Sequence, residues 1–482
     1  MKKINGIIMQ YFEWYMECEQ NLWNNIKEQA KKLSELGITA IWLPPAYKGI
    51  GGANEVGYGA YDLYDLGEFD QKGSIKTKYG SKDEYLECIE VLKQNDIESY
   101  ADIVLNHKMG ADKLQTIPAT KVDWGNHNLQ ISNQETVRVA TKFTFPGRKH
   151  KYSEFEWNWT HFDGIDYDEN SKEHAIFKFK DKNWNNAVDE EFGNYDYLMG
   201  ADIDFNNPEV VEELNKWGKW YLDFTGVDSF RLDAVKHIKS GFMADWIRKM
   251  KETRPDLQCV GEYWNRNIDT LKKYIDNTNS TIPLFDVALH YNFYEASNCD
   301  GNFDFARIFE NTLVKKMPSL AVTFVDNHDT EPGQALFSWI PDWFKPLAYA
   351  LILLRKGGLP CIFYGDYYGI PSQNICAKKE MLDNLMQLRT NYAYGEQFDY
   401  FDHHDIIAWI RTGDDEHSNS GLVTIMSDGP GGGKTMNVGK RMANSTFYDY
   451  TGNVKETVYV DNEGNGIFYC NGGSVSVWVR KE

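Results

Sequence analysis

The strongest constraint on the fold of this chain is a set of four short apolar segments that end abruptly in polar side chains. They span residues 97–107, 227–237, 257–262 and 321–329, and carry His107, Asp233, Glu262 and Asp329 at or near their ends. In a (β/α)8 barrel the catalytic groups lie at the carboxyl ends of the parallel strands. A single Asp at such a position is more commonly a strand cap or part of a surface ion pair. Four such segments in one chain favour a barrel enzyme.

The second segment carries Arg231 and Asp233 two residues apart. Side chains at this spacing point to the same face of a strand. A buried strand has no structural use for such a pair. At the mouth of a barrel, however, the guanidinium would keep Asp233 ionised and oriented, as a carboxylate nucleophile requires.

Four sequence motifs resemble the ordered signature regions of the α-amylase family of glycoside hydrolases. They are DIVLNH (102–107), FRLDAVKH (230–237), GEYW (261–264) and FVDNHD (324–329). The similarity runs from QYFEWY (10–15) to GGSVSV (472–477), and this end-to-end pattern is similar to that of the liquefying α-amylases of bacilli. The resemblance implies endo-acting, retaining hydrolysis of α-1,4-glucosidic bonds in starch, glycogen or maltodextrins through a covalent glycosyl-aspartate.

The same resemblance implies an α/β fold: a (β/α)8 barrel with an inserted β-rich domain after the third strand and a C-terminal antiparallel β-sandwich. The sequence pattern agrees, because strand and helix patterns alternate except over 107–206, which is rich in Trp, Asn, Asp and Gly, and after 394, where short alternating strands follow one another. We therefore expect a barrel formed by residues 1–106 and 207–394, an inserted calcium-binding domain at 107–206 and a sandwich at 395–482. The inserted domain shows short β-like runs such as 142–145, so we expect short strands there.

Two local predictions concern the ends of elements. Ser81, with Glu84 three residues later, predicts a capping box at the start of a helix that ends near Asn95. The segments 285–287, 321–325 and 359–364 are predicted as the last three barrel strands.

The resemblance assigns roles to individual residues. Asp233 is the expected nucleophile, and Glu262 the acid/base, whose pKa must be raised by burial and neighbouring carboxylates. Asp329 would bind the ring hydroxyls and strain the sugar toward the oxocarbenium shape, with His107 and His328 as further hydrogen-bond donors. The remaining substrate contacts are expected from Trp14, Tyr58, Tyr195, Arg231, Lys236, His237 and Trp264.

Calcium is the expected cofactor, because Asp and Asn side chains and backbone carbonyls supply the six to eight oxygens that it prefers. The resemblance places one ion on Asn106, Asp196, Asp202 and the backbone oxygen of His237. A second, calcium–sodium cluster would use Asp163, Asp204, Asn185 and Asn206. Since two of these positions are neutral amides, we expect that cluster to be weakened. A further bridging site would use Gly301, Phe303, His404, Asp405 and Asp428.

Composition limits the partners and the location. The net charge of −20 argues against nucleic acid and anionic membranes as partners, and the longest apolar run, 347–354, is too short to cross a bilayer. The seven cysteines form no CxxC motif, and Asn5 and Gln10 interrupt the apolar segment that a signal peptide would need. We therefore expect a cytoplasmic monomer that acts on an α-glucan. The alternative is a secreted protein in which Met1 replaces a removed signal peptide.

Three interpretations compete at this point. The favoured one is an endo-acting hydrolase of α-1,4-glucans. A transglycosylase or an exo-acting enzyme would use the same chemistry and differ in whether the cleft is open or blocked. A non-catalytic barrel used for binding would be supported by the loss of one of the three carboxylates, and all three are present.

Overall fold

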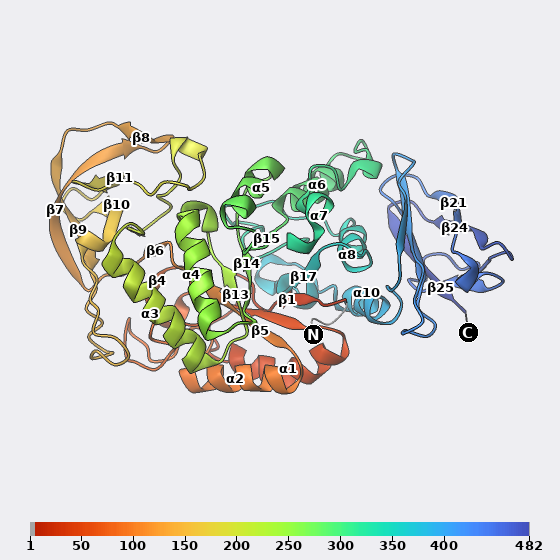
Figure 1. Cartoon of the computed structure of the whole chain (residues 1–482), viewed down its shortest axis with the longest axis horizontal. Coiled ribbons are helices and arrows are strands. Elements are labelled where there is room, and N and C mark those ends of the chain that lie inside the picture. The colour runs from red at the N-terminus through yellow and green to blue at the C-terminus, as the bar shows by residue number, and fades with distance from the viewer. Residues whose placement is uncertain (1–4, 482) are drawn as a thin grey trace.

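The computed structural model describes residues 5–481 and has a closed barrel of eight parallel strands at its centre (Figure 1). The strands are β1 (Ile8–Gln10), β2 (Ala40–Leu43), β5 (Glu98–Ile103), β13 (Ser229–Leu232), β14 (Gln258–Gly261), β15 (Leu284–Phe285), β16 (Ala321–Phe324) and β17 (Leu359–Phe363). Each pairs with the barrel strand before and after it along the chain, and β17 closes the barrel against β1. The predicted (β/α)8 barrel is confirmed.

Helices connect most of the barrel strands. They are α1 (Leu22–Glu35), α2 (Lys82–Gln94), α3 (Pro208–Thr225), α4 (Ser240–Thr253), α5 (Ile268–Asn277), α6 (Val287–Asn298), α7 (Leu313–Lys316), α8 (Lys345–Leu353), α9 (Tyr364–Tyr368) and α10 (Lys379–Asn391). The predicted capping box of α2 is present: the Ser81 hydroxyl accepts the Glu84 N–H, and the Glu84 carboxylate accepts the Ser81 N–H. These two bonds satisfy N–H groups that the first turn leaves without helical partners.

A seven-stranded antiparallel sheet follows the third barrel strand and precedes α3. Its strands are β6 (His107–Lys108), β7 (Lys113–Asp123), β8 (Asn126–Gln130), β9 (Glu135–Lys142), β10 (Phe162–Asp168), β11 (Glu173–Phe179) and β12 (Ala201–Ile203), in the order β6-β12-β10-β11-β7-β8 with β9 on β7. The expectation of short strands was wrong for β7, which has eleven residues. Both β6 and β12 lie close to the barrel mouth, because β6 begins at His107, four residues after β5 ends.

The C-terminal part forms two antiparallel sheets at the other end of the long axis from the inserted sheet (Figure 1). One contains β18 (Gln397–Tyr400), β19 (Ile406–Arg411), β20 (Leu422–Ser427), β25 (Ser474–Arg480), β22 (Thr446–Asp449) and β23 (Val458–Tyr459), and the other contains β21 (Gly432–Asn437) and β24 (Asn465–Cys470). Phe447, Phe468 and Trp478 belong to the core between them. The predicted β-rich C-terminal fold is confirmed, whereas the domain limits at 106, 206 and 394 stay a prediction.

Two segments differ in detail from the sequence-based expectation. Val287 is the first residue of α6 and not the end of a strand, because the Asp286 carboxylate accepts the Leu289 N–H and so caps this helix. The long loop 49–73 contains the short strand β4 (Ala60–Asp62), which pairs with β3 (Lys48–Gly49). Between residues 5 and 481, no helix has both the length and the apolar character that a membrane crossing requires.

Candidate active site and metal-binding clusters

A single guanidinium, that of Arg231, connects three carboxylates at the mouth of the barrel. It donates to Asp102 Oδ1 at 2.8 Å and to Asp233 Oδ1 at 2.5 Å, and lies 3.9 Å from Glu262 Oε2. The strand register explains this arrangement, since Arg231 on β13 pairs with Asp102 on β5. Arg231 is 1% exposed, so water screens these interactions poorly. A buried cation that contacts carboxylates in this way fixes their orientation and opposes the rise in pKa that burial causes at Asp102 and Glu262.

Glu262, directly after β14, is positioned by a strained turn. Ala234 adopts a left-handed conformation with φ of 49°, which is uncommon for a residue with a Cβ. In this conformation the Ala234 N–H donates to Glu262 Oε2 at 2.8 Å. Burial raises the pKa of Glu262 to about 8, and the Asp233 and Asp329 carboxylates add to the effect while Arg231 opposes it. Glu262 can therefore hold a proton at neutral pH, as a general acid must.

Asp329 lies in a turn that a buried ion cluster holds against the barrel. Its N–H donates to the Asn327 side chain at 2.9 Å, and burial raises the pKa of its carboxyl to about 7, opposed by Arg231 and reinforced by other carboxylates. Asp326, at the start of the same turn, accepts hydrogen bonds from Thr330 Oγ1 at 2.8 Å and from Lys345 Nζ at 2.7 Å. The turn is thus fixed to α8 by a fully buried ammonium.

Three rings form one wall of the site beside these carboxylates. Trp14, Tyr58 and His328 are parallel to within 9°, and their centroids are 4.9 to 6.1 Å apart. Tyr58 also donates its hydroxyl to Asp102 Oδ2 at 2.9 Å, and its carbonyl lies 2.8 Å from Nε2 of His107. Burial lowers the pKa of both His107 and His328, so both rings are neutral near neutral pH and each has one N–H. His107 donates this N–H to the Tyr58 carbonyl, so it differs from the expected donor and offers Nδ1 as an acceptor. The half-exposed rings of Trp14 and Tyr58 present apolar faces of the kind that sugars stack on.

A second group brings together four other predicted contact residues. The Lys236 ammonium lies 4.6 Å above the Tyr195 ring and donates to the Trp264 carbonyl at 3.2 Å. His237 donates from Nδ1 to the Tyr195 carbonyl at 2.7 Å, and the two rings meet edge to face. Lys236 also pairs with Glu191 at 2.8 Å, a residue that the sequence motifs did not indicate.

A buried group of carboxylates lies between the inserted sheet and the barrel. Asp163, Asp196 and Asp202 offer oxygens within 4.8 Å of one another, and all three residues are buried. Asp163 Oδ1, Asp202 Oδ2 and both side-chain atoms of Asn106 have no hydrogen-bond partner. Burial raises the pKa of Asp196 to about 7 and that of Asp202 well above its ordinary value, where Asp196 adds repulsion. Clustered oxygens without donors fit a hard cation such as calcium, which takes oxygen ligands only.

The other end of this group is filled by the protein's own donors. Lys182 Nζ donates to Asp204 Oδ2 at 2.6 Å and to the Thr160 carbonyl at 2.5 Å. Asn185 Nδ2 donates to both Asp163 Oδ2 and Asp196 Oδ2 at 3.0 Å. Asn206 Nδ2 in turn donates to Asn185 Oδ1 at 2.9 Å. No sequence motif pointed to Lys182.

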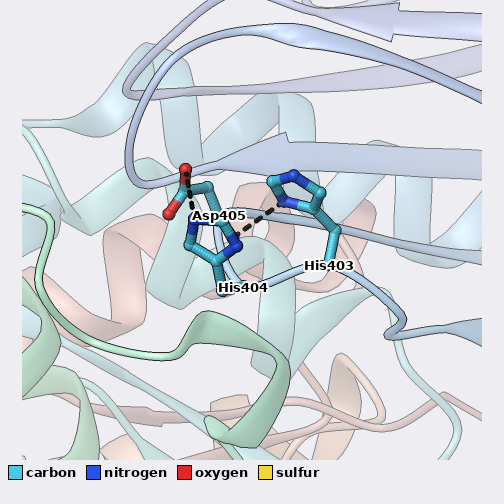
Figure 2. Close-up of side chains that lie close together, drawn as sticks. All are labelled: His403, His404 and Asp405. Carbon is cyan, nitrogen blue, oxygen red and sulfur yellow. Dashed lines mark hydrogen bonds and ion pairs between the residues drawn. The ribbon is translucent and has the colours of Figure 1, made fainter.

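A second group with metal-ligand chemistry lies apart from the barrel mouth, at the junction with the C-terminal sheets. Figure 2 shows His403, His404 and Asp405, whose ligand atoms lie within 4.8 Å of one another. Asp428 follows β20, its N–H lies 3.4 Å from the Asp405 carbonyl, and both its carboxylate oxygens are buried without a partner. The Phe305 N–H donates to the His404 carbonyl at 2.6 Å, which brings the segment with Gly301 and Phe303 beside this group. The predicted bridging residues therefore gather in one region, and His403 joins them.

The structure also indicates residues whose role the sequence analysis did not assign. Asp102 was noted only as part of a strand, yet it accepts hydrogen bonds from Arg231, Tyr58 and Trp42. Trp42 lies in an ordinary apolar strand pattern, so nothing in its sequence context indicated a polar contact. Lys345 lies in the first turn of an otherwise apolar helix, and that isolated charge was the only available signal.

Comparison with known proteins gives consistent results over nearly the whole chain. A family model described as "Alpha amylase, catalytic domain" matches residues 21–409, and "Alpha-amylase C-terminal" matches residues 422–479. An α-amylase of Geobacillus stearothermophilus is 54% identical over 99% of this chain and 87% of its own length. A cytoplasmic α-amylase of Escherichia coli (strain K12) is 45% identical over 99% of both chains. The solved structure of an Anoxybacillus α-amylase, at 17% identity, matches 100% of this chain and 99% of its own with a TM-score of 0.65, which concerns the fold alone.

Proposed function

This chain belongs to the α-amylase family of glycoside hydrolases, and we propose that it cleaves internal α-1,4-glucosidic bonds of starch, glycogen or maltodextrins with retention of the anomeric configuration. The observation that carries the proposal is that Asp233 and Glu262 both form ion pairs with one buried guanidinium. They do so at the carboxyl ends of neighbouring barrel strands. Retaining glycosidases need two such carboxyl groups with different protonation states. The Arg231 guanidinium donates to Asp233, while burial favours the protonated form of Glu262.

In the proposed reaction the Asp233 carboxylate attacks the anomeric carbon while Glu262 gives its proton to the departing glycosidic oxygen. The product of this step is a glycosyl ester on Asp233, and the new chain end leaves as an alcohol. Glu262, now a carboxylate, then takes a proton from water as that water attacks the anomeric carbon and releases Asp233. Two displacements at the same carbon give net retention.

Binding of the sugar is proposed to use the wall of rings and the second group of contact residues. Asp329, with His107 and His328, would bind ring hydroxyls, and the parallel rings of Trp14 and Tyr58 would stack on sugars on that side. The second group, Lys236, His237, Tyr195 and Trp264, would contact the leaving-group sugars. Arg231 contacts the carboxylates and is proposed to act through them.

We propose calcium at the buried carboxylates of the inserted sheet, held by Asn106, Asp196, Asp202 and the His237 carbonyl. The unpartnered oxygens of Asn106 and Asp202 support this assignment. Calcium would there neutralise carboxylates and tie the inserted sheet to the turn that follows Asp233. A separate site, with lower charge, is proposed on His404, Asp405 and Asp428 with the carbonyls of Gly301 and Phe303.

For the location we propose the cytoplasm, supported by the 45% identical relative from Escherichia coli, whose name states that location. The alternative is secretion. The chain is proposed to act as a monomer on its glucan.

The proposed function is tested by proton NMR of the anomeric signals during digestion of maltoheptaose. We expect α-anomers of several internal products to appear first, and no products from Glu262→Gln. Glu35→Gln, an exposed position at the end of α1, is the matched control and should behave as the wild type. Initial β-anomers would overturn the assignment of Asp233 as nucleophile, and a single product released from one end would favour an exo-acting enzyme. The absence of any cleavage in the presence of calcium would favour a binding protein.

A further inference from the structure

The buried carboxylates of the inserted sheet carry more negative charge than one calcium ion can balance. Four aspartates, Asp163, Asp196, Asp202 and Asp204, are each at most 7% exposed, and three of them offer oxygens within 4.8 Å of one another. Charges that are removed from water need a partner, or they take up protons instead. The compensating positive charge must therefore come from the protein itself, from bound metal ions, from protons, or from a combination of these.

The oxygens of the group differ in whether they have a hydrogen-bond partner among the described residues. Asn106, Asp163 and Asp202 contain the oxygens without donors, whereas Asp204 Oδ2 is occupied by Lys182 at 2.6 Å. Lys182 also donates to the Thr160 carbonyl, so its ammonium lies among oxygens as a metal ion would. Its side chain is 15% exposed, and its charge also acts on the neighbouring carboxyl of Asp163.

Asn185 supplies further hydrogen-bond donors to the carboxylates at the centre of the group. Its single NH2 group bridges Asp163 and Asp196, with both distances at 3.0 Å. An NH2 group donates two hydrogen bonds, which are both used here, so these two carboxylate oxygens are already occupied. Asn206 fixes the orientation of this amide by donating to its oxygen at 2.9 Å.

We propose that Lys182 is a built-in cation that takes the place of a second metal ion at the Asp163–Asp204 end of the group, so that this group binds one divalent ion and no more. Without the ammonium, the Asp204 carboxylate, the Thr160 carbonyl and Asp163 would be left as a hard-oxygen site for a further calcium ion. The inference rests on the calcium site proposed above for Asn106, Asp196 and Asp202.

The test is to count calcium per chain by flow dialysis at pH 8 in the wild type, Lys182→Met and Lys180→Met. Lys180 is exposed two residues away, and its substitution removes the same charge. We expect Lys182→Met to bind one more calcium ion than the wild type, and Lys180→Met to bind the same number as the wild type. Lys182→Arg, which keeps the charge, should also show no gain.

A second variant and a second measurement keep the test independent of a folding defect in Lys182→Met. Lys182→Gln exchanges the ammonium for a neutral amide, and should also take up an additional calcium ion. In both variants the melting temperature should depend on calcium concentration more steeply than in Lys180→Met. If neither variant binds more calcium than the wild type, the proposal is overturned. The proposed calcium site itself fails separately, if Asp202→Asn binds as much calcium as the wild type.

Discussion

Calcium binding should be strongly coupled to the release of protons in this protein. In the metal-free chain, burial raises the pKa of Asp196 to about 7 and that of Asp202 well above its ordinary value. At pH 6 the Asp196 carboxyl therefore holds a proton, which calcium must displace because only the ionised form is a strong ligand. With this proton released per ion, the apparent association constant should rise about tenfold per pH unit, or about 1.4 kcal/mol, between pH 5 and 7, and the raised pKa of Asp202 acts in the same direction.

Above pH 7 the slope should become shallower, because Asp196 is then ionised without calcium. The raised pKa values also affect the stability of the metal-free protein. A carboxyl whose folded pKa is raised makes the metal-free protein less stable as the pH rises from about 3.9 toward the folded pKa, by about 1.4 kcal/mol per unit and per group. Calcium removes this loss, so chelation should lower the free energy of unfolding much more at pH 7 than at pH 5.

The assay is isothermal titration calorimetry of metal-free protein with calcium, in two buffers of different ionisation enthalpy. The comparison gives the number of protons released, and we expect at least one at pH 6 and fewer at pH 8, where Asp196 is already ionised. Asp428→Asn is the suitable background, since it removes the separate group near His404 from the signal. If no protons are released at pH 6, the carboxyls are ionised without metal, and the argument from burial is wrong.

Four further predictions concern catalysis and the buried charges. Glu262→Gln should lower kcat by about a thousandfold with little change in KM, because general acid catalysis contributes on this order; a wild-type kcat would contradict the assignment. Since burial and neighbouring carboxylates raise the pKa of Glu262 to about 8, kcat/KM should fall as the pH rises through that value, and a decline centred near pH 5 would refute this origin. Arg231→Met leaves Asp102 as an uncompensated buried carboxylate and should lower the free energy of unfolding in urea by about 3–5 kcal/mol. Arg231→Lys keeps the charge and should lower it by less. Equal losses of stability would argue against the charge pairing. Lys345→Met removes the cation that holds Asp326 and should lower both stability and kcat. Lys345→Arg keeps the charge and should retain part of the kcat that Lys345→Met loses. Equal kcat values for the two variants would argue against a role for the charge.

The sequence predicted which residues carry the chemistry of the site, but it did not predict the contacts that surround them. Asp233, Glu262 and Asp329 could be identified because each ends an apolar segment, and the carboxyl ends of parallel strands meet at one face of a barrel. The pairing of Arg231 with Asp233 followed from the two-residue period of a strand. The contact of the same guanidinium with Asp102 depends on the register of β13 against β5, which no local pattern determines.

The sequence by itself determined the fold class, the family and the residue types at the site, because these follow from local periodicity and from motifs of neighbouring residues. Only the tertiary structure decided which charges share a partner and how far their pKa values move, because burial and long-range contacts control both. Glu262 is an ordinary strand-end glutamate in the sequence, and its pKa rises to about 8 only in the closed barrel. Lys182 is one of many lysines in a polar segment, and its position beside Asp204 and the Thr160 carbonyl results from contacts between distant residues of the inserted segment.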